Sequence, residues 1–464
     1  MAPRPKGRGA FLCLLFRVAS KNRIFAFWQS FCPVKMERRG PLELMAPAGD
    51  YESLQAALDA GADSVYFGVG QLNMRARATV NFTAEDLAEV AKRCRERGVR
   101  SYLAVNTIVY DHDLEAIEDL LDKAVLAGVS AVIASDISVI LAARARGLEV
   151  HISTQQNISN IRAVEFFSAY ADTMVLAREL SLTQVKEICR QIDQRGIKGP
   201  SGRKVEVEIF GHGALCMAIS GKCYLSLHAH NSSANRGACR QDCRRAYVVR
   251  DKETGYELEV GDPYIMSPKD LCTIGLLDRI VDAGVRILKI EGRGRSPEYV
   301  QTVVSVYREA IDACARGEYS AVKALEWEER LRGVYNRGFW EGYYLGRRMG
   351  QWSGYPGSHA TRRKVYVGRG LHYYPKPGVG EILVEAAELH RGDEILITGP
   401  TTGVKTFVLG DFMVDDRPAT RAGKGDHVTL PLDFKLRMAD KVYKVEATEY
   451  ASGGKSGDGS EEKN

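Results

Sequence analysis

A helix that ends in glycine and is followed at once by a short apolar strand recurs along this chain from Leu42 onward. The clearest instances are DAGADSVYFG at 59–68, LAGVSAVIAS at 126–135 and DAGVRILKIEG at 282–292. Glycine supplies the left-handed residue that closes a helix, and a continuous Val, Ile and Leu run suits a strand covered on both faces. The repeat therefore predicts buried parallel strands that alternate with helices.

Eight such strands can be counted before residue 300. They are expected near 42–46, 64–68, 101–106, 131–134, 149–153, 173–177, 205–210 and 286–290. Eight parallel strands with helices between them predict a (β/α)8 TIM-type barrel of about 250 residues. A doubly wound open sheet is the alternative, but the first strand is followed by APAGD at 46–50 and not by the G-x-G-x-x-G of that fold.

Four of the ten cysteines lie in the Gly-, Ser- and Asn-containing stretch 208–245. Cys216, Cys223, Cys239 and Cys243 follow the pattern C-x6-C-x15-C-x3-C. Four thiolates suit a tetrahedral zinc ion or a 4Fe-4S cluster. The spacing favours iron and sulfur, because zinc sites usually combine two short C-x2-4-C knuckles and only the second pair resembles one. Buried cysteines that pack as small hydrophobic residues are the structural alternative.

Polar residues stand where several predicted strands end, and active sites of this fold lie at those ends. We predict catalytic roles for His212, Gln155 and Glu291, and substrate binding by Arg293, Arg295 and Asn106. Two arginines on the glycine-rich loop EGRGR suit a carboxylate or a phosphate, because a guanidinium group donates two parallel hydrogen bonds. Some strand-end residues instead suit helix capping, as Asp50 and Asp136 do.

The predicted domain layout follows from these patterns. A basic extension at 1–40 is expected to be disordered or to precede the true translation start. The barrel spans 41–320, with a cysteine-rich insertion at 211–262 after strand seven. A connector at 321–362, a small β-barrel at 363–449 and a disordered tail at 450–464 follow. Residues 1–35 hold seven Lys or Arg and no acidic residue, and Met36 is the favoured start. Their apolar run at 11–16 is too short to span a membrane.

Composition adds two expectations. A net charge of +5 over 464 residues makes no case for nucleic acid by itself. Ten cysteines in a chain of this length do not resemble a secreted disulfide scaffold, so we predict a reducing, cytoplasmic location.

The sequence after residue 320 predicts a second module. The segment YNRGFWEGYYLGRRMGQW at 335–352 combines aromatic and Arg side chains, which suits either base stacking with phosphate contacts or an interface between domains. Short alternating runs from Lys364 to about Val445 predict a β-barrel of five or six strands, one of them spanning VKTFVLGDFMV at 404–414. Such barrels often bind RNA.

Several long motifs, in order, resemble the peptidase U32 family. They are ELMAPAGDYESLQAALDAGADSVYFG at 43–68, EIFGHGALCMAISGKC at 208–223, NRGACRQDCR at 235–244, SPKDLC at 267–272 and KIEGRGRSPEYV at 289–300. The resemblance covers about 42–350, and the last module is similar to a C-terminal domain of some members. The branch most similar in length and architecture implies prephenate-dependent hydroxylation of the tRNA wobble uridine to 5-hydroxyuridine. Other members hydroxylate ribosomal RNA or quinone precursors without oxygen.

The resemblance also implies the cofactor and partners. It places a 4Fe-4S cluster on Cys216, Cys223, Cys239 and Cys243, with Cys272 as a spare ligand, prephenate as the acidic donor, tRNA as the substrate and room for an electron-donor protein. One departure concerns the residues after Cys243, which are RRAY here where the tRNA-acting relatives have an aromatic residue.

Three alternatives stay open at this stage. A peptidase is one, although H-E-x-x-H is absent and a Cys–His pair would have to use His212 with Cys216, a predicted cluster ligand. An oxygen-independent hydroxylase of ribosomal RNA or of a quinone precursor is another, and the quinone-pathway enzyme would have no use for an RNA-sized second module. A binding scaffold around a structural zinc is the third, which metal analysis would distinguish.

Overall fold

The computed structural model describes residues 42–77, 80–245, 249–255, 257–258, 267–346, 350–353 and 357–452. The basic extension predicted for 1–40 lies outside these residues, as do 453–464 of the predicted tail and parts of the predicted insertion.

Eight parallel strands form a closed barrel within the described residues, which confirms the predicted fold. Each strand pairs with the next along the chain, and the last pairs with both the seventh and the first. The strands are β1 (Glu43–Pro47), β2 (Ser64–Gly68), β3 (Arg100–Val105), β4 (Ala131–Ala134), β5 (Glu149–Ile152), β6 (Thr173–Val175), β7 (Glu206–Gly213) and β11 (Ile287–Ile290). All eight overlap the ranges that the sequence predicts, with ends that differ by up to three residues.

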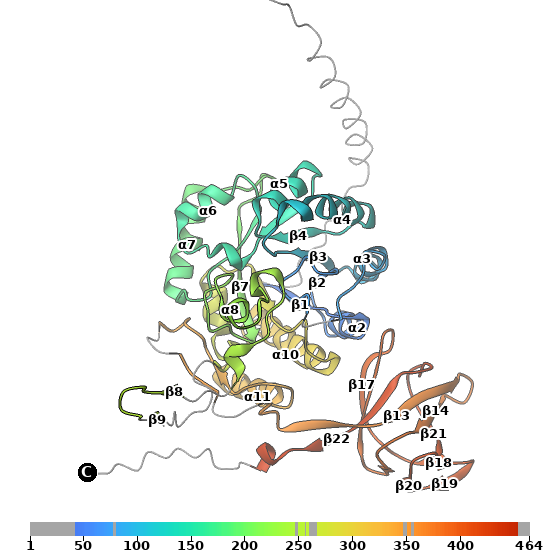
Figure 1. The fold of residues 1–464 in the computed structure, drawn as a ribbon. Coiled ribbons are helices and arrows are strands. Elements are labelled where there is room, and N and C mark those ends of the chain that lie inside the picture. The colour runs from blue at the N-terminus through green and yellow to red at the C-terminus, as the bar shows by residue number, and fades with distance from the viewer. Residues whose placement is uncertain are drawn as a thin grey trace, which may run out of the picture. The chain divides into compact units, whose positions relative to one another are not determined.

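Helices surround these strands (Figure 1). They are α2 (Tyr51–Asp59), α3 (Leu87–Glu96), α4 (Leu114–Ala127), α5 (Ile137–Ala145), α6 (Ile161–Phe167), α7 (Leu182–Arg195), α9 (Leu277–Asp282) and α10 (Pro297–Arg316). Asp50 and Asp136 cap α2 and α5 through their carboxylates, as predicted. Among the described helices, none is both long and apolar enough to cross a bilayer.

The barrel interior combines apolar and ionisable side chains. Met45, Tyr66, Tyr102, Ile133 and Ile287 belong to an apolar cluster inside it. The opposite faces of the strands pack on the helices in the main core, as expected for parallel strands covered on both sides. Buried carboxylates, a lysine and a histidine also occupy the interior.

The insertion predicted at 211–262 lies between β7 and β11. It contains α8 (Leu225–His230) and the hairpin of β8 (Val249–Arg250) and β9 (Glu257–Leu258), and β10 (Asp270–Cys272) follows it. Strand β10 runs antiparallel to the end of β7 and parallel to β12 (Phe339–Trp340). Because β12 belongs to the aromatic segment 335–352, part of that segment extends the sheet of the barrel.

After α11 (Ala321–Arg332) the described chain forms an antiparallel sheet of eight strands around its own apolar core. In spatial order they are β17 (Gly403–Val408), β16 (Glu394–Gly399), β22 (Lys441–Ala447), β13 (Arg362–Tyr374), β14 (Val379–Val384), β21 (His427–Pro431), β18 (Phe412–Val414) and β19 (Arg417–Ala419). β15 (Leu389–His390) pairs separately with β20 (Arg421–Ala422).

This sheet has more strands than the five or six predicted. The run 404–414 is not one strand, because the chain leaves β17 at Leu409 and begins β18 at Phe412. Between them lie Gly410 and Asp411, which are turn-forming residues. The short strand β19 then returns antiparallel to β18.

Candidate functional site

A cavity of about 690 Å³ lies at the carboxyl ends of the barrel strands. Its floor includes Tyr66 of β2, Phe210 of β7 and Lys289 of β11, and residues 214–225 of the insertion form part of its wall. This is the end of a parallel barrel where βα loops converge and where ligands bind in this fold.

All four cysteines of the predicted metal site line this cavity, and none is in a disulfide. Burial is the main cause that raises the pKa of the Cys243 thiol to about 11, and the charges of Cys216, Cys239 and Cys223 contribute to this rise, which indicates that the four lie near one another. Within the described residues, no three Cys, His, Asp or Glu side chains already stand at metal-binding distances. Four thiols around one cavity are nevertheless a donor set that fits a soft metal or an iron–sulfur cluster.

Protein contacts join the two cysteine pairs. The Arg244 guanidinium, next to Cys243, donates to the Leu215 carbonyl at 2.7 Å, to Ser267 Oγ at 2.7 Å and to the Pro268 carbonyl at 2.8 Å. Leu215 immediately precedes Cys216. One side chain therefore connects the second pair to the beginning of the first.

Five of the six predicted catalytic and substrate-binding residues line the cavity: Gln155, Asn106, Glu291, Arg293 and Arg295. Asn106 donates to Ser153 Oγ at 3.3 Å and to Gln155 Oε1 at 3.5 Å, while its own oxygen accepts from the Met74 amide at 3.2 Å. Asn106 and Gln155 thus form one polar edge at the ends of β3 and β5. Their roles in chemistry stay predictions.

Glu291 forms an ion pair that the sequence did not reveal. Arg75, in the loop after β2, donates to Glu291 Oε1 through Nε at 3.1 Å and Nη2 at 2.6 Å. Burial would raise the pKa of Glu291, but the guanidinium groups of Arg75, Arg295 and Arg293 together outweigh burial, so the pKa lies below its ordinary value. Glu291 is therefore a carboxylate at neutral pH and suits a hydrogen-bond acceptor better than a proton donor.

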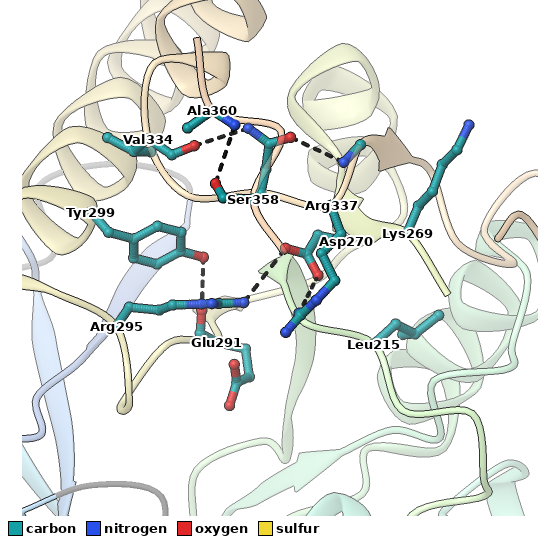
Figure 2. Close-up of polar contacts among 12 residues, drawn as sticks. Leu215, Lys269, Asp270, Glu291, Arg295, Tyr299, Val334, Arg337, Ser358 and Ala360 are labelled. Atoms are coloured by element: carbon teal, nitrogen blue, oxygen red, sulfur yellow. Dashed lines mark hydrogen bonds and ion pairs between the residues drawn. The ribbon is translucent and has the colours of Figure 1, made fainter. Parts of the chain in front are cut away.

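The two predicted anion-binding arginines are already bonded to protein groups. Arg293 is 5% exposed and donates to Asn73 Oδ1 at 3.0 Å, and burial lowers its pKa to about 10. Arg295 lies 3.6 Å from Asp270 Oδ2 and 3.8 Å above the centre of the Tyr335 ring. Figure 2 shows Arg295 and Arg337 approaching Asp270 from two sides.

Further cations line the same cavity. Arg178 donates to Ser220 Oγ at 3.1 and 2.8 Å, and Lys222, Arg244, Lys289 and Arg337 also face it. Glu291 is the one acidic residue among the described lining residues. A cavity with this excess of positive charge favours anionic ligands.

Two other candidates lie outside the cavity lining. His212 is 1% exposed and packs among the rings of Tyr299, Tyr307 and Phe339, and burial lowers its pKa to about 3. Cys272 is buried on β10, with Sγ 3.9 Å from the Tyr307 hydroxyl. The geometry therefore gives no support for a contact between His212 and a ligand, or for Cys272 as a spare ligand.

Asp270 is expected to stabilise the cavity wall. It is 1% exposed and is the acidic partner of Arg295 and Arg337, at 3.6 and 3.3 Å (Figure 2). Asp270→Asn should lower the free energy of unfolding by roughly 3 kcal/mol, because two largely buried guanidinium groups lose their counter-charge. Urea unfolding of both proteins measures this. The control is Asp282→Asn, whose exposed pair with Lys186 is worth about 0.5 kcal/mol or less; equal losses in both variants would contradict the assignment.

The fold and the cavity together define a (β/α)8-barrel protein with a thiol-lined, cationic site at the mouth of the barrel. The family model described as "Peptidase family U32" matches residues 49–354. The chain belongs to this family, as the sequence motifs predicted.

Three relatives illustrate what the chain is similar to. A protein named "Collagenase" from Porphyromonas gingivalis is 53% identical over 407 residues, which cover 88% of this chain and 98% of the relative. "tRNA hydroxylation protein P1" from Bacillus subtilis is 35% identical over 414 residues, covering 86% and 93%. "tRNA hydroxylation protein P" from Escherichia coli is 31% identical over 374 residues, covering 70% and 80%.

Proposed function

We propose that this protein is an iron–sulfur RNA-modifying enzyme that hydroxylates a pyrimidine base of tRNA. The specific reaction proposed is prephenate-dependent conversion of the wobble uridine to 5-hydroxyuridine. The observation on which the proposal rests is one cavity at the barrel mouth that is lined by four free thiols and by an excess of cations. Near-full-length similarity to proteins named for tRNA hydroxylation supports the same reaction.

Each part of the cavity has a place in this proposal. Cys216, Cys223, Cys239 and Cys243 would hold a 4Fe-4S cluster, which supplies electron transfer when cysteines bind all four irons. Arg178 and Lys222, which have no carboxylate partner in the described structure, are suited to the carboxylates of an acidic donor. The wobble base lies in a single-stranded loop, so it can enter the mouth at low unstacking cost. A tRNA substrate implies a cytoplasmic location.

Nucleoside analysis of tRNA tests this function. Deleting the gene should remove 5-hydroxyuridine or its derivatives from bulk tRNA, and the wild-type gene should restore them. A variant with Arg178→Ala, which changes the cavity but no cysteine, should restore less than about one tenth of the modification, because it loses a charge-assisted contact worth about 1.5–3 kcal/mol. Unchanged nucleosides in the deletion strain would exclude the tRNA assignment.

Proteolysis is the second candidate, because the relative with 53% identity is named a collagenase. The structure does not assemble the Cys–His pair that such chemistry would use: Cys216 lines the cavity, whereas His212 is enclosed by aromatic rings outside its lining. Incubation of the anaerobically purified protein with gelatin and with fibrillar collagen distinguishes the two candidates. Cleavage that survives Cys216→Ala would favour a peptidase of another kind.

A further inference from the structure

Below the cavity, the barrel interior holds a connected series of ionisable side chains. Lys289 lines the cavity, and its Nζ lies 2.8 Å from Glu208 Oε1. The other oxygen of this carboxylate, Oε2, lies 3.3 Å from His151 Nδ1. Glu208 and His151 are both 0% exposed. These contacts run from β11 through β7 to β5, across the interior of the barrel.

The series continues towards the opposite end of the barrel. His151 Nε2 is buried and has no hydrogen-bond partner, and it lies 3.7 Å from Glu149 Oε1. Glu149 opens β5 and pairs at 3.1 Å with Arg203, whose side chain is 48% exposed. An unpaired buried nitrogen is unfavourable, so its position facing a carboxylate calls for an explanation. The series therefore reaches solvent at the amino ends of the strands.

The surroundings of His151 keep it inside this series. The Tyr102 ring lies 4.6 Å from the imidazole, but the Tyr102 hydroxyl donates to Glu43 Oε1 at 2.7 Å, and Glu43 also pairs with Arg100 at 2.9 Å. Burial lowers the pKa of His151, yet the two carboxylates of Glu149 and Glu208 outweigh burial and raise it to about 8. A group that titrates near neutrality and contacts acids on both sides can accept and release protons.

We propose that Lys289, Glu208, His151 and Glu149 form a proton relay between the cavity and the solvent at the other end of the barrel. In the imidazolium form of His151 both nitrogens carry a proton. When the Lys289 ammonium gives a proton to a group in the cavity, the Nδ1 proton of His151 replaces it through Glu208 and leaves a neutral imidazole. Rotation of that ring turns its bare nitrogen to the Glu149 side, where it takes up a proton and restores the imidazolium. One proton enters for each one delivered, no electrons move, and the reverse direction removes a proton. The relay rests on the proposed function, in which an RNA base and an acidic donor fill the mouth and exclude water.

The first test needs no catalytic activity. In full-length protein labelled with ¹³C at its nine histidines, the His151 signal is identified by its loss in His151→Gln, and its shift is followed from about pH 6 to about pH 9.5. We expect titration near pH 8, shifted upward by about one unit in Lys289→Met, because Glu208 then loses its competing cation. A His151 signal that keeps one protonation state throughout would overturn the relay, since a fixed proton cannot be passed on.

Thermal unfolding gives a second readout. Since the pKa of His151 in the folded state lies above its unfolded value of about 6.5, its stabilising contribution is complete below that pH and is lost as the pH rises through about 8. The Tm should therefore fall over this interval in the wild type, and it should fall less in Glu208→Gln. An unchanged slope in Glu208→Gln would contradict the coupling between the two groups.

The rate of uridine hydroxylation as a function of pH distinguishes a relay from a structural cluster. Glu208→Gln should lower the rate at least about tenfold and remove the pH-dependent limb near pH 8. The matched control is Glu43→Gln, which changes another buried interior carboxylate, bonded to Tyr102 and Arg100; it should keep the wild-type profile. Equal changes in both variants would overturn the relay. A wild-type protein without hydroxylation would instead reject the proposed function, and the histidine titration would still decide the relay.

Discussion

Cys243→Ala is expected to lose nearly all iron and acid-labile sulfide on anaerobic purification. Loss of a neighbour that only orients a ligand already lowers metal affinity by about 10–100-fold, so loss of a ligand should cost roughly 100-fold or more. Cys243 lines the cavity with three other free thiols, and a 4Fe-4S cluster requires that set. Iron, sulfide and zinc are quantified in the same sample, together with the visible absorption of the cluster.

The matched control is Cys272→Ala. This thiol is buried on β10 beside Tyr307 and outside the cavity lining, so the variant should keep the wild-type iron and sulfide content. Iron loss in Cys272→Ala with normal folding would mean that Cys272 replaces one of the four. One zinc per chain and no sulfide in the wild type would exclude the cluster and favour a structural zinc.

Gly213→Ala is expected to destabilise the protein by roughly 3 kcal/mol. Gly213 ends β7 with φ at +107°, and a Cβ there would lie 2.4 Å from the Glu291 carbonyl oxygen. The clash adds to the cost of the left-handed backbone, and neither backbone can move freely because the Glu291 carbonyl accepts from the Tyr299 hydroxyl at 3.0 Å (Figure 2). Chemical unfolding measures the loss.

Gly275→Ala provides the comparison for this substitution. A Cβ on Gly275 would meet no atom within 4 Å, and its backbone is not in the left-handed region. Stability should therefore change by about 0.5 kcal/mol or less. If Gly213→Ala were as stable as Gly275→Ala, the ends of β7 and β11 would not be packed as described.

The barrel could be predicted because most of its strands carry a local pattern. Glycine closes the helix before several of them and a largely apolar run follows, and this pattern requires no knowledge of distant contacts. The C-terminal sheet was predicted less well. The turn residues Gly410 and Asp411 separate β17 from β18, but apolar residues flank them on both sides, and the run 404–414 was therefore predicted as one strand.

The residues of the candidate site were also predicted only in part. The cysteines, Asn106, Gln155 and Glu291 were found because they follow strands or form a motif. Arg75 was missed because its partner Glu291 lies 216 residues away along the chain. His212, like Gln155, lies near the carboxyl end of a strand and was predicted to face the site for that reason. Aromatic side chains of α10 and β12 enclose it instead, and the local sequence does not indicate this packing. Lys289 was also missed, although a lysine within an otherwise apolar buried strand is a signal in the sequence that could have identified it.

The bonds of Arg244 have a consequence for how a cofactor would be acquired. They attach the chain beside Cys243 to the carbonyl before Cys216 and to Ser267 and Pro268 through protein groups alone. Folding has then already met much of the entropic cost of gathering the loops. We expect the apoprotein to bind the cofactor with small rearrangements of side chains. In a zinc finger, by contrast, metal binding drives the folding of the chain.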